Sequence, residues 1–260
     1  MIPKRSVACC VLILVLWGCA GLKKPELHHK LPAHVAAADP ETIVDRLERI
    51  NQDLSSLKGI GRIKIWKFNK LQSTRMAWAG YRPEKLRLEI LGITGRPLSS
   101  VAFDGKRLYL SLHAENQFYQ RQTRHADLRR FISIPISIPD TLAILSGRVP
   151  LLANASASLE MPPLQDHCIL TLKKNWFKKR TAKIYLGADL RTVRQYELYG
   201  AEDKLRYRVE YLQRKQYGAY QLPVALQISD DQHTRIQIEA DRIWPDADVP
   251  SEMFVLKPPG

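Results

Sequence analysis

Cysteine is scarce in this sequence and is concentrated at one end of it. Of four cysteines in 260 residues, Cys9, Cys10 and Cys19 lie near the N-terminus, and Cys168 alone follows them. A disulfide bond joins two thiols, so the long segment after Cys19 cannot contain an internal one. We therefore expect its fold to be held by a hydrophobic core.

Enzyme motifs are also missing. The sequence contains no GxSxG, no HExxH, no phosphate-binding glycine loop and no paired-cysteine metal site. His28, His29 and His34 could hold a transition metal weakly, but a solvated segment is the simpler interpretation. The sequence favours a protein that is not an enzyme and that has no metal or other cofactor.

Long hydrophobic runs are absent except for one near the start. Lys4 and Arg5 precede an uncharged stretch, residues 7–18, which ends at Cys19. A membrane-spanning helix needs about 20 apolar residues. The stretch is shorter than that, so it is typical of a cleaved signal peptide.

The residues before Cys19 resemble the signal of bacterial lipoproteins. Leu16 and Gly18 stand where that signal has leucine and a small residue. The resemblance implies that residues 1–18 are removed and that Cys19 becomes a lipidated N-terminus. Ala20 in the next position implies the outer membrane, facing the periplasm. An ordinary secretory signal is the alternative.

A flexible tether and a helix are predicted next. Residues 19–39 contain proline, alanine, lysine and histidine without a period, as flexible linkers do. Asp39 is a suitable N-cap and Pro40 a suitable first residue for a helix. One amphipathic helix is predicted from the apolar stripe that follows, which consists of Ile43, Leu47, Ile50, Leu54 and Leu57.

The hydrophobic period changes to two after this helix. In residues 85–91, apolar and charged side chains alternate strictly, as they do in an antiparallel strand with one buried face. About eleven segments show the same alternation of apolar and polar side chains. The simplest arrangement is one domain over residues 40–260, with a single curved antiparallel sheet that forms a half-barrel.

Short helices are predicted between the two halves of the sheet. One begins near Pro139 and stops at Gly147, and residues 128–132 suggest another before it. Together with the first helix, they could close the half-barrel around an apolar cavity. The predicted class is therefore mainly β, of the α+β type.

The order of these elements resembles the LolA/LolB family of bacterial lipoprotein-sorting proteins. The likeness covers residues 40–260 and rests on LEILGITGRPLSSVAFDG, on ILSGRVP in the helical insertion and on the closing PSEMFVLKPPG. It implies a half-barrel that holds acyl chains. The lipoprotein signal before Cys19 favours the membrane-anchored, LolB-like members. The cavity candidates are then Met76, Trp78, Leu86, Leu88, Ile90, Leu108, Leu110, Phe131, Leu142 and Leu145. These side chains could equally form a solid core.

The resemblance also implies an apolar residue that projects from a loop between early strands and helps to deliver lipoproteins into the membrane. The sequence EILGITGRPL puts Leu91 first and Ile93 second for this role. The alternative is that Leu91 ends a strand and faces the core, while Ile93 is an ordinary, partly exposed loop residue.

Positive charge exceeds negative charge, with a net charge of +14. Residues 173–180, KKNWFKKR, combine five cations with two aromatic residues, a composition that suits an anionic membrane interface or an acidic partner. A solvated hairpin is the alternative. We do not expect nucleic acid as a partner, because an exported, lipid-tethered protein would rarely meet it.

Two functions agree with these observations. The first is a monomeric receptor that is anchored in the outer membrane, accepts acylated lipoproteins from a LolA-like periplasmic carrier and passes them to the inner leaflet of that membrane. The second is an envelope scaffold or assembly lipoprotein that uses the half-barrel as a protein-binding platform. An open apolar cavity of several hundred Å³ favours the first function, and a packed interior favours the second.

Overall fold

The computed structural model describes residues 38–68, 70–162, 165–174 and 179–258. The predicted signal peptide, Cys19 and the tether up to residue 37, with its three histidines, lie outside these residues. The centre of the basic hairpin at 173–180 also lies outside them. No helix in the described ranges is long and apolar enough to cross a membrane.

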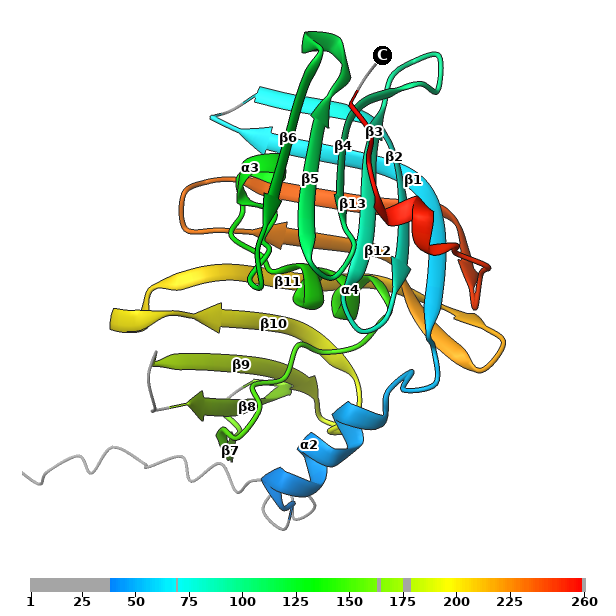
Figure 1. Ribbon diagram of the computed structural model, residues 1–260. Coiled ribbons are helices and arrows are strands. Elements are labelled where there is room, and N and C mark those ends of the chain that lie inside the picture. Colours follow the sequence, from blue (N-terminus) through cyan, green and yellow to red (C-terminus); the bar gives the residue numbers. More distant parts are fainter. Residues whose placement is uncertain (1–37, 69, 163–164, 175–178, 259–260) are drawn as a thin grey trace, which may run out of the picture. The chain divides into compact units, whose positions relative to one another are not determined.

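One antiparallel sheet of 13 strands makes up most of the described chain and confirms the predicted class of fold. The sheet is curved and does not close on itself, so β6 and β7 are its two edges (Figure 1). In spatial order, its strands are β6 (Gln117–Gln122), β5 (Arg107–Leu112), β4 (Pro97–Phe103), β3 (Lys85–Leu91), β2 (Lys70–Tyr81), β1 (Ser56–Lys67), β13 (Arg235–Pro245), β12 (Tyr220–Ser229), β11 (Leu205–Tyr217), β10 (Val193–Tyr199), β9 (Arg180–Gly187), β8 (His167–Lys174) and β7 (Ser156–Glu160).

The sheet consists of two meanders that meet at one seam. Strands β1 to β6 pair in chain order, as do β7 to β13, and the meanders join where β1 pairs with β13. A bulge interrupts this seam between Ile60 and Gly61. A Cβ atom on Gly61 would lie 2.1 Å from the carbonyl oxygen of Glu239, so the close approach of the two backbones requires glycine here.

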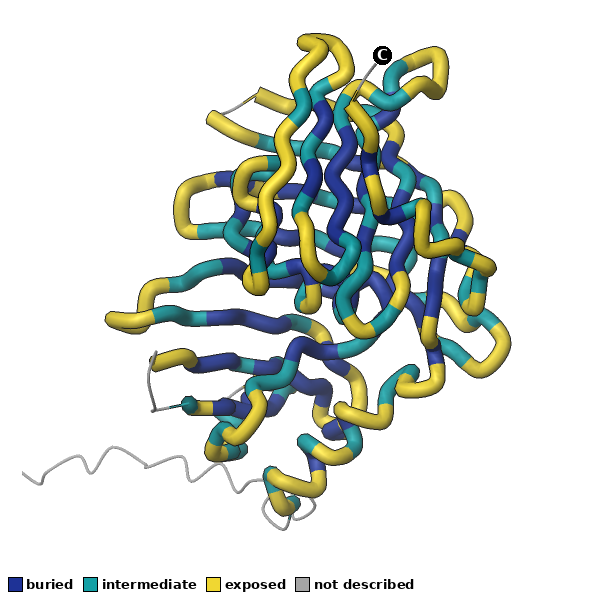
Figure 2. Tube along the Cα trace, in the orientation of Figure 1, coloured by how far each residue is buried: buried dark blue, intermediate teal, exposed yellow. Residues whose placement is uncertain are grey.

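The hydrophobic core lies on one face of the sheet, which we call the inner face. Along β3, Leu86 and Leu88 point to this face and are buried, while Arg87 and Glu89 alternate with them on the outer face. Buried residues occupy the centres of most strands, and exposed residues gather at the hairpin tips (Figure 2). The period of two in the sequence therefore corresponds to observed burial.

Two helices between the meanders lie on the inner face. The first, α3 (Arg129–Ile132), is one short turn. The second, α4 (Ile138–Leu145), has Ser137 as its N-cap, and the Ser137 hydroxyl oxygen accepts a hydrogen bond of 3.1 Å from the backbone N–H of Asp140. Pro139 is thus the second helical residue and not the first. Gly147, with a φ of +73°, ends the helix as predicted.

The first helix is shorter than its apolar stripe predicts. Helix α2 (Pro40–Arg49) begins at the predicted cap but ends well before Leu57, which belongs to β1. Asn51 turns the chain with a φ of 47°, and its side-chain amide donates hydrogen bonds to the carbonyl oxygens of Ser146 (2.8 Å) and Gln221 (2.9 Å). These tertiary contacts end the helix, although Leu54 and Leu57 stay buried.

The two edge strands were not among the predicted segments. β6 has the sequence QFYQRQ, in which polar residues occupy most positions and nearly all are exposed. β7 has only five residues, SASLE. Edge strands are often short or polar, which prevents pairing with other chains. Polarity removes the hydrophobic pattern from β6, and in β7 the alternation is too short to predict a strand.

Candidate functional site

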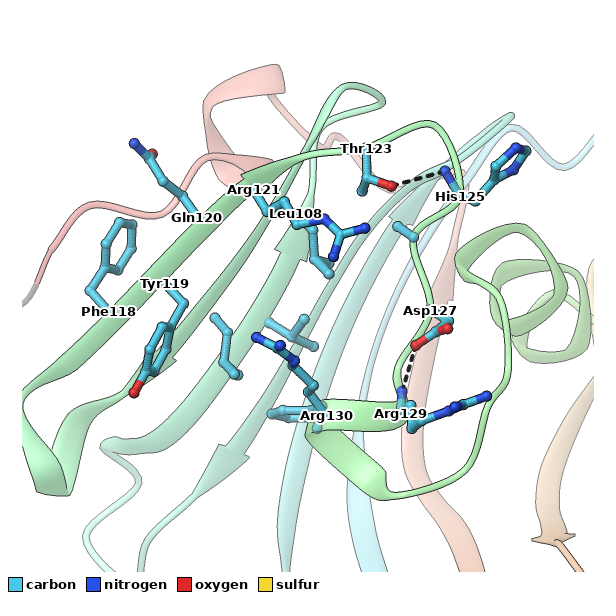
Figure 3. A pocket seen from close by; sticks show the side chains of 14 residues that line it. Leu108, Phe118, Tyr119, Gln120, Arg121, Thr123, His125, Asp127, Arg129 and Arg130 are labelled. Atoms are coloured by element: carbon cyan, nitrogen blue, oxygen red, sulfur yellow. Dashed lines mark hydrogen bonds between the residues drawn. The ribbon is translucent and has the colours of Figure 1, made fainter.

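A hollow of about 640 Å³ opens between edge strand β6 and the segment that leads into α3. Its apolar floor is formed by Val101 of β4, Leu108 and Leu110 of β5, and Phe131 of α3. Leu108 is labelled in the close view of the hollow (Figure 3). Val101 pairs with Leu110, and Leu110 pairs with Tyr119 of β6. The hollow therefore continues the inner face towards the open edge of the sheet.

Basic side chains surround this floor. Arg121 from β6 and Arg130 from α3 both extend over the hollow (Figure 3). Arg129 also belongs to the lining, and its backbone N–H donates a hydrogen bond of 3.0 Å to Asp127 Oδ1. The hollow thus combines an apolar floor with a cationic rim, an arrangement that suits an amphiphile and not a purely apolar ligand.

The predicted cavity residues divide into two groups. Leu108, Leu110 and Phe131 line the hollow, and Ile90 is half-buried against the core. The others are almost completely buried in a packed core: Met76, Trp78, Leu86, Leu88, Leu142 and Leu145. The single large cavity implied by the resemblance is therefore filled at its centre, largely by α4, and open near β6.

Close packing at this centre is visible around Trp78. A Cβ atom on Gly59 of β1 would lie 2.1 Å from the indole ring, so the ring covers the backbone of the neighbouring strand. The indole N–H has no hydrogen-bond partner among the described residues. Such contact leaves no space for a ligand between Trp78 and β1.

The inner face of the second meander is filled by tyrosines and aliphatic side chains. Tyr196 and Tyr207 are buried with ring centroids 5.9 Å apart, and the Tyr207 hydroxyl donates a hydrogen bond of 2.9 Å to Asp140 Oδ2. Burial raises the pKa of both tyrosines well above the ordinary value, so both hydroxyls remain donors. Cys168 is also buried and free, and burial raises the pKa of its thiol.

The tip between β3 and β4 differs from the prediction. Leu91 is the last residue of β3 and only 7% exposed, so it does not project. Ile93 is fully exposed. The tip is closed by a hydrogen bond of 2.8 Å from the N–H of Gly92 to the carbonyl oxygen of Arg96, and Gly95 takes a φ of +81°. The apolar side chain that projects here is therefore Ile93.

A second apolar side chain projects from another hairpin tip of the first meander. Phe68, at the tip between β1 and β2, is 77% exposed, and the ammonium group of Lys67 lies 5.8 Å from its ring centroid. Because β1 and β3 each pair antiparallel with β2, the β1–β2 and β3–β4 tips lie at the same end of their strands. Phe68 was not among the residues predicted to project, although an aromatic residue between Lys67 and Lys70 was a usable signal.

The basic rim of the hollow was also missed. Arg121, Arg129 and Arg130 fall in the segment RQTRHADLRR, whose density of arginine was the available signal. Their convergence depends on the pairing of β6 with β5. Since β6 was not recognised as a strand, nothing in the sequence pattern placed Arg121 beside α3.

No protein-family model matches this sequence, and no curated protein is similar to it at a significant level. Solved structures do match its fold. A LolA-superfamily protein from Nitrosomonas europaea matches 85% of this chain and 99% of its own, with a TM-score of 0.59 and 12% identity. A DUF1329-family protein from Desulfovibrio piger matches 84% and 98%, with a TM-score of 0.61 and 12% identity.

A third match is a domain named as an outer-membrane lipoprotein-sorting protein, from Vibrio parahaemolyticus. It covers 83% of this chain and 97% of its own, with a TM-score of 0.57 and 10% identity. Identities this low establish a common fold and not a common activity. The chain therefore has the unclosed, curved sheet of LolA-superfamily structures.

Proposed function

We propose that this protein is a lipoprotein receptor that is anchored in the outer membrane through Cys19. It accepts acylated lipoproteins from a LolA-like periplasmic carrier and releases them into the inner leaflet of that membrane. It acts by binding and transfer and makes or breaks no covalent bond. The observation that carries the proposal is the hollow next to β6, whose floor is apolar and open to ligands.

The floor of the hollow is suited to an acyl chain. Val101, Leu108, Leu110 and Phe131 present adjacent aliphatic and aromatic surface. Each buried methylene group contributes about 0.8 kcal/mol, so an acyl chain lying on this floor would be held firmly. Release then requires a competing apolar environment, which a bilayer supplies.

The projecting tips supply a route to that bilayer. Ile93 and Phe68 are apolar and exposed, and each lies at a hairpin tip of the first meander. Lys67, Lys70 and Arg96 flank them. Apolar side chains beside cations favour the interface of a membrane with anionic lipids, and we assign Ile93 the insertion role first considered for Leu91.

A scaffold function is supported by a different observation. The inner face of the second meander is filled by side chains such as Tyr196, Tyr207 and Leu170, as in a protein whose sheet serves only as a platform. The two functions make different predictions for lipoprotein capture, because a platform has no need to bind acyl chains.

The test is a transfer assay with the lipidated chain in phosphatidylcholine liposomes. A triacylated lipoprotein loaded on its carrier is added, and the lipoprotein bound to the receptor and the lipoprotein inserted in the liposomes are both quantified. We expect stoichiometric capture followed by insertion. Ile93→Glu should reduce insertion and leave capture unchanged, whereas Ile93→Leu should preserve both. Absence of capture at every salt concentration would overturn the receptor and favour the scaffold.

A further inference from the structure

The rim of the hollow carries more positive charge than an uncharged lipid requires. Arg121, Arg129 and Arg130 line it with one carboxylate, Asp127. The three arginines are exposed, and their guanidinium groups form no ion pair or hydrogen bond with the residues that the structure describes. The one contact of Asp127 with them uses the backbone N–H of Arg129 and leaves its guanidinium free.

The cations stand directly beside the apolar floor. Arg121 pairs with Leu108 across β6 and β5, and paired residues on neighbouring strands lie about 5 Å apart. Arg130 approaches from α3 on the opposite side of the hollow (Figure 3). A molecule whose chain rests on Leu108 and Leu110 would therefore place its polar end between Arg121 and Arg130.

An acylated cysteine does not account for this rim. Its ester, thioether and amide groups carry no ionised oxygen, so they gain little from guanidinium groups. A carboxylate or phosphate forms strong, often bidentate hydrogen bonds with arginine. Such a group would also relieve the repulsion among neighbouring cations, whose guanidinium groups have no partner among the described residues.

We propose that the hollow selects a single-chain anionic amphiphile, with its acyl chain on Val101, Leu108, Leu110 and Phe131 and its carboxylate or phosphate between Arg121 and Arg130. The volume of about 640 Å³ lies within the range of drug-sized ligands and fits one chain with its head group. The inference rests on the apolar floor of the proposed function and gives that floor a second class of ligand, which would occupy it in place of a lipoprotein acyl chain.

The test uses the lipidated full chain in phosphatidylcholine vesicles, which have no net anionic lipid. Three diazirine probes of equal chain length are compared: a fatty acid, a lysophosphatidic acid and a fatty acid methyl ester. After photolysis, labelled peptides are mapped by mass spectrometry. Peptides that contain Leu108, Leu110 or Phe131 should be labelled about tenfold more by an anionic probe than by the ester, on the scale of one charge-assisted hydrogen bond at a partly exposed site.

The arginines are tested by a charge-matched pair of variants. Arg121→Gln/Arg130→Gln should lower anionic labelling to the level of the ester and leave ester labelling unchanged. Arg75→Gln/Arg191→Gln removes two exposed cations outside the hollow and should have no effect. Selective labelling by the fatty acid alone would identify a carboxylate site, and selective labelling by lysophosphatidic acid alone would identify a phosphate site. Selective labelling by both would identify a general anion site. Each of these results supports the proposal.

Three results would overturn the proposal: equal labelling by the ester, no labelling of these peptides by any probe, or anionic labelling that survives loss of Arg121 and Arg130. The transfer assay on the same vesicles separates it from the receptor function. Lipoprotein transfer without anionic selectivity would contradict the anion site and leave the receptor function supported. Anionic selectivity without lipoprotein transfer would support the anion site and contradict the receptor function.

Discussion

Arg208 donates a hydrogen bond of 2.7 Å from its Nε to Oε1 of Glu197, whose side chain is only 1% exposed although it lies on the outer face of the sheet. The hydroxyl groups of Tyr185 and Tyr199 donate to Oε2 of the same carboxylate at 2.8 and 2.6 Å. A further bond of 3.0 Å comes from the amide of Gln195. These four side chains cover the carboxylate and connect β9, β10 and β11.

Removal of this carboxylate should destabilise the second meander. We expect Glu197→Ala to lower the free energy of unfolding by about 2–3 kcal/mol, because it leaves Arg208 and two tyrosines without their acceptor. Partial exposure of Arg208 keeps the effect below that of a fully buried pair. Urea denaturation followed by circular dichroism measures the change. Glu202→Gln, at an exposed carboxylate, is the control, and a similar loss in both variants would contradict the prediction.

The same carboxylate should make stability depend on pH in the acidic range. Burial alone would raise the pKa of Glu197, but hydrogen bonds from Tyr199, Tyr185 and Arg208 outweigh it and hold the pKa below its usual 4.5. The folded state therefore favours the charged form, and its contribution is complete above pH 4.5 and disappears as the pH falls below that value. Urea midpoints measured from pH 6 to pH 3 should fall less steeply for Glu197→Gln than for the native chain, and parallel curves would refute this assignment.

Truncation should destabilise the protein at Leu91 and leave its stability nearly unchanged at Ile93, although both residues lie near the β3–β4 tip. Leu91→Ala should cost about 2–4 kcal/mol of unfolding free energy, because it removes a buried side chain. Ile93→Ala should change it by less than about 0.5 kcal/mol, because Ile93 is fully exposed. Thermal and urea unfolding of both variants provides the measurement. A large cost at Ile93 would show that its side chain has a packing role.

Two variants of Asn51 should separate the contribution of its backbone conformation to stability from that of its side-chain hydrogen bonds. Asn51→Ala loses the hydrogen bonds to Ser146 and Gln221 and also places a non-glycine side chain at a φ of 47°. Asn51→Gly loses the same bonds but adopts that conformation without strain. We expect the alanine variant to be less stable than the glycine variant by about 1 kcal/mol. Equal stability in urea denaturation would mean that the conformation contributes nothing.

The sheet was predictable from sequence because most of its strands have one solvent-facing side and one buried side. The alternation in residues 85–91 reappears as buried Leu86 and Leu88 beside polar Arg87 and Glu89. Edge strand β6 has no such contrast, and β7 shows it over only five residues, so their existence follows from pairing with β5 and β8. The end of α2 was predicted wrongly for a related reason, because Asn51 is hydrogen-bonded to residues far away in the chain.

The candidate site was predictable only in its apolar half. Leu108, Leu110 and Phe131 were recognisable as inward-facing residues, whereas the position of Arg121 depends on a strand with no hydrophobic signature. Hydrophobic pattern also could not distinguish an open hollow from a filled one. Leu142 of α4 occupies the space over Gly80, where an added Cβ atom would lie 2.4 Å from it, and this outcome is set by side-chain packing.

The seam between β1 and β13 has a consequence for how the chain assembles. Each meander is built from neighbouring hairpins and can form soon after its residues are available, but Ile63 meets Ile238 only when nearly the whole chain is present. Contacts of such sequence separation are slow to form. Until then, the edge of β1 that pairs with β13 stays unpaired, and a holding chaperone at that stage would protect it from aggregation.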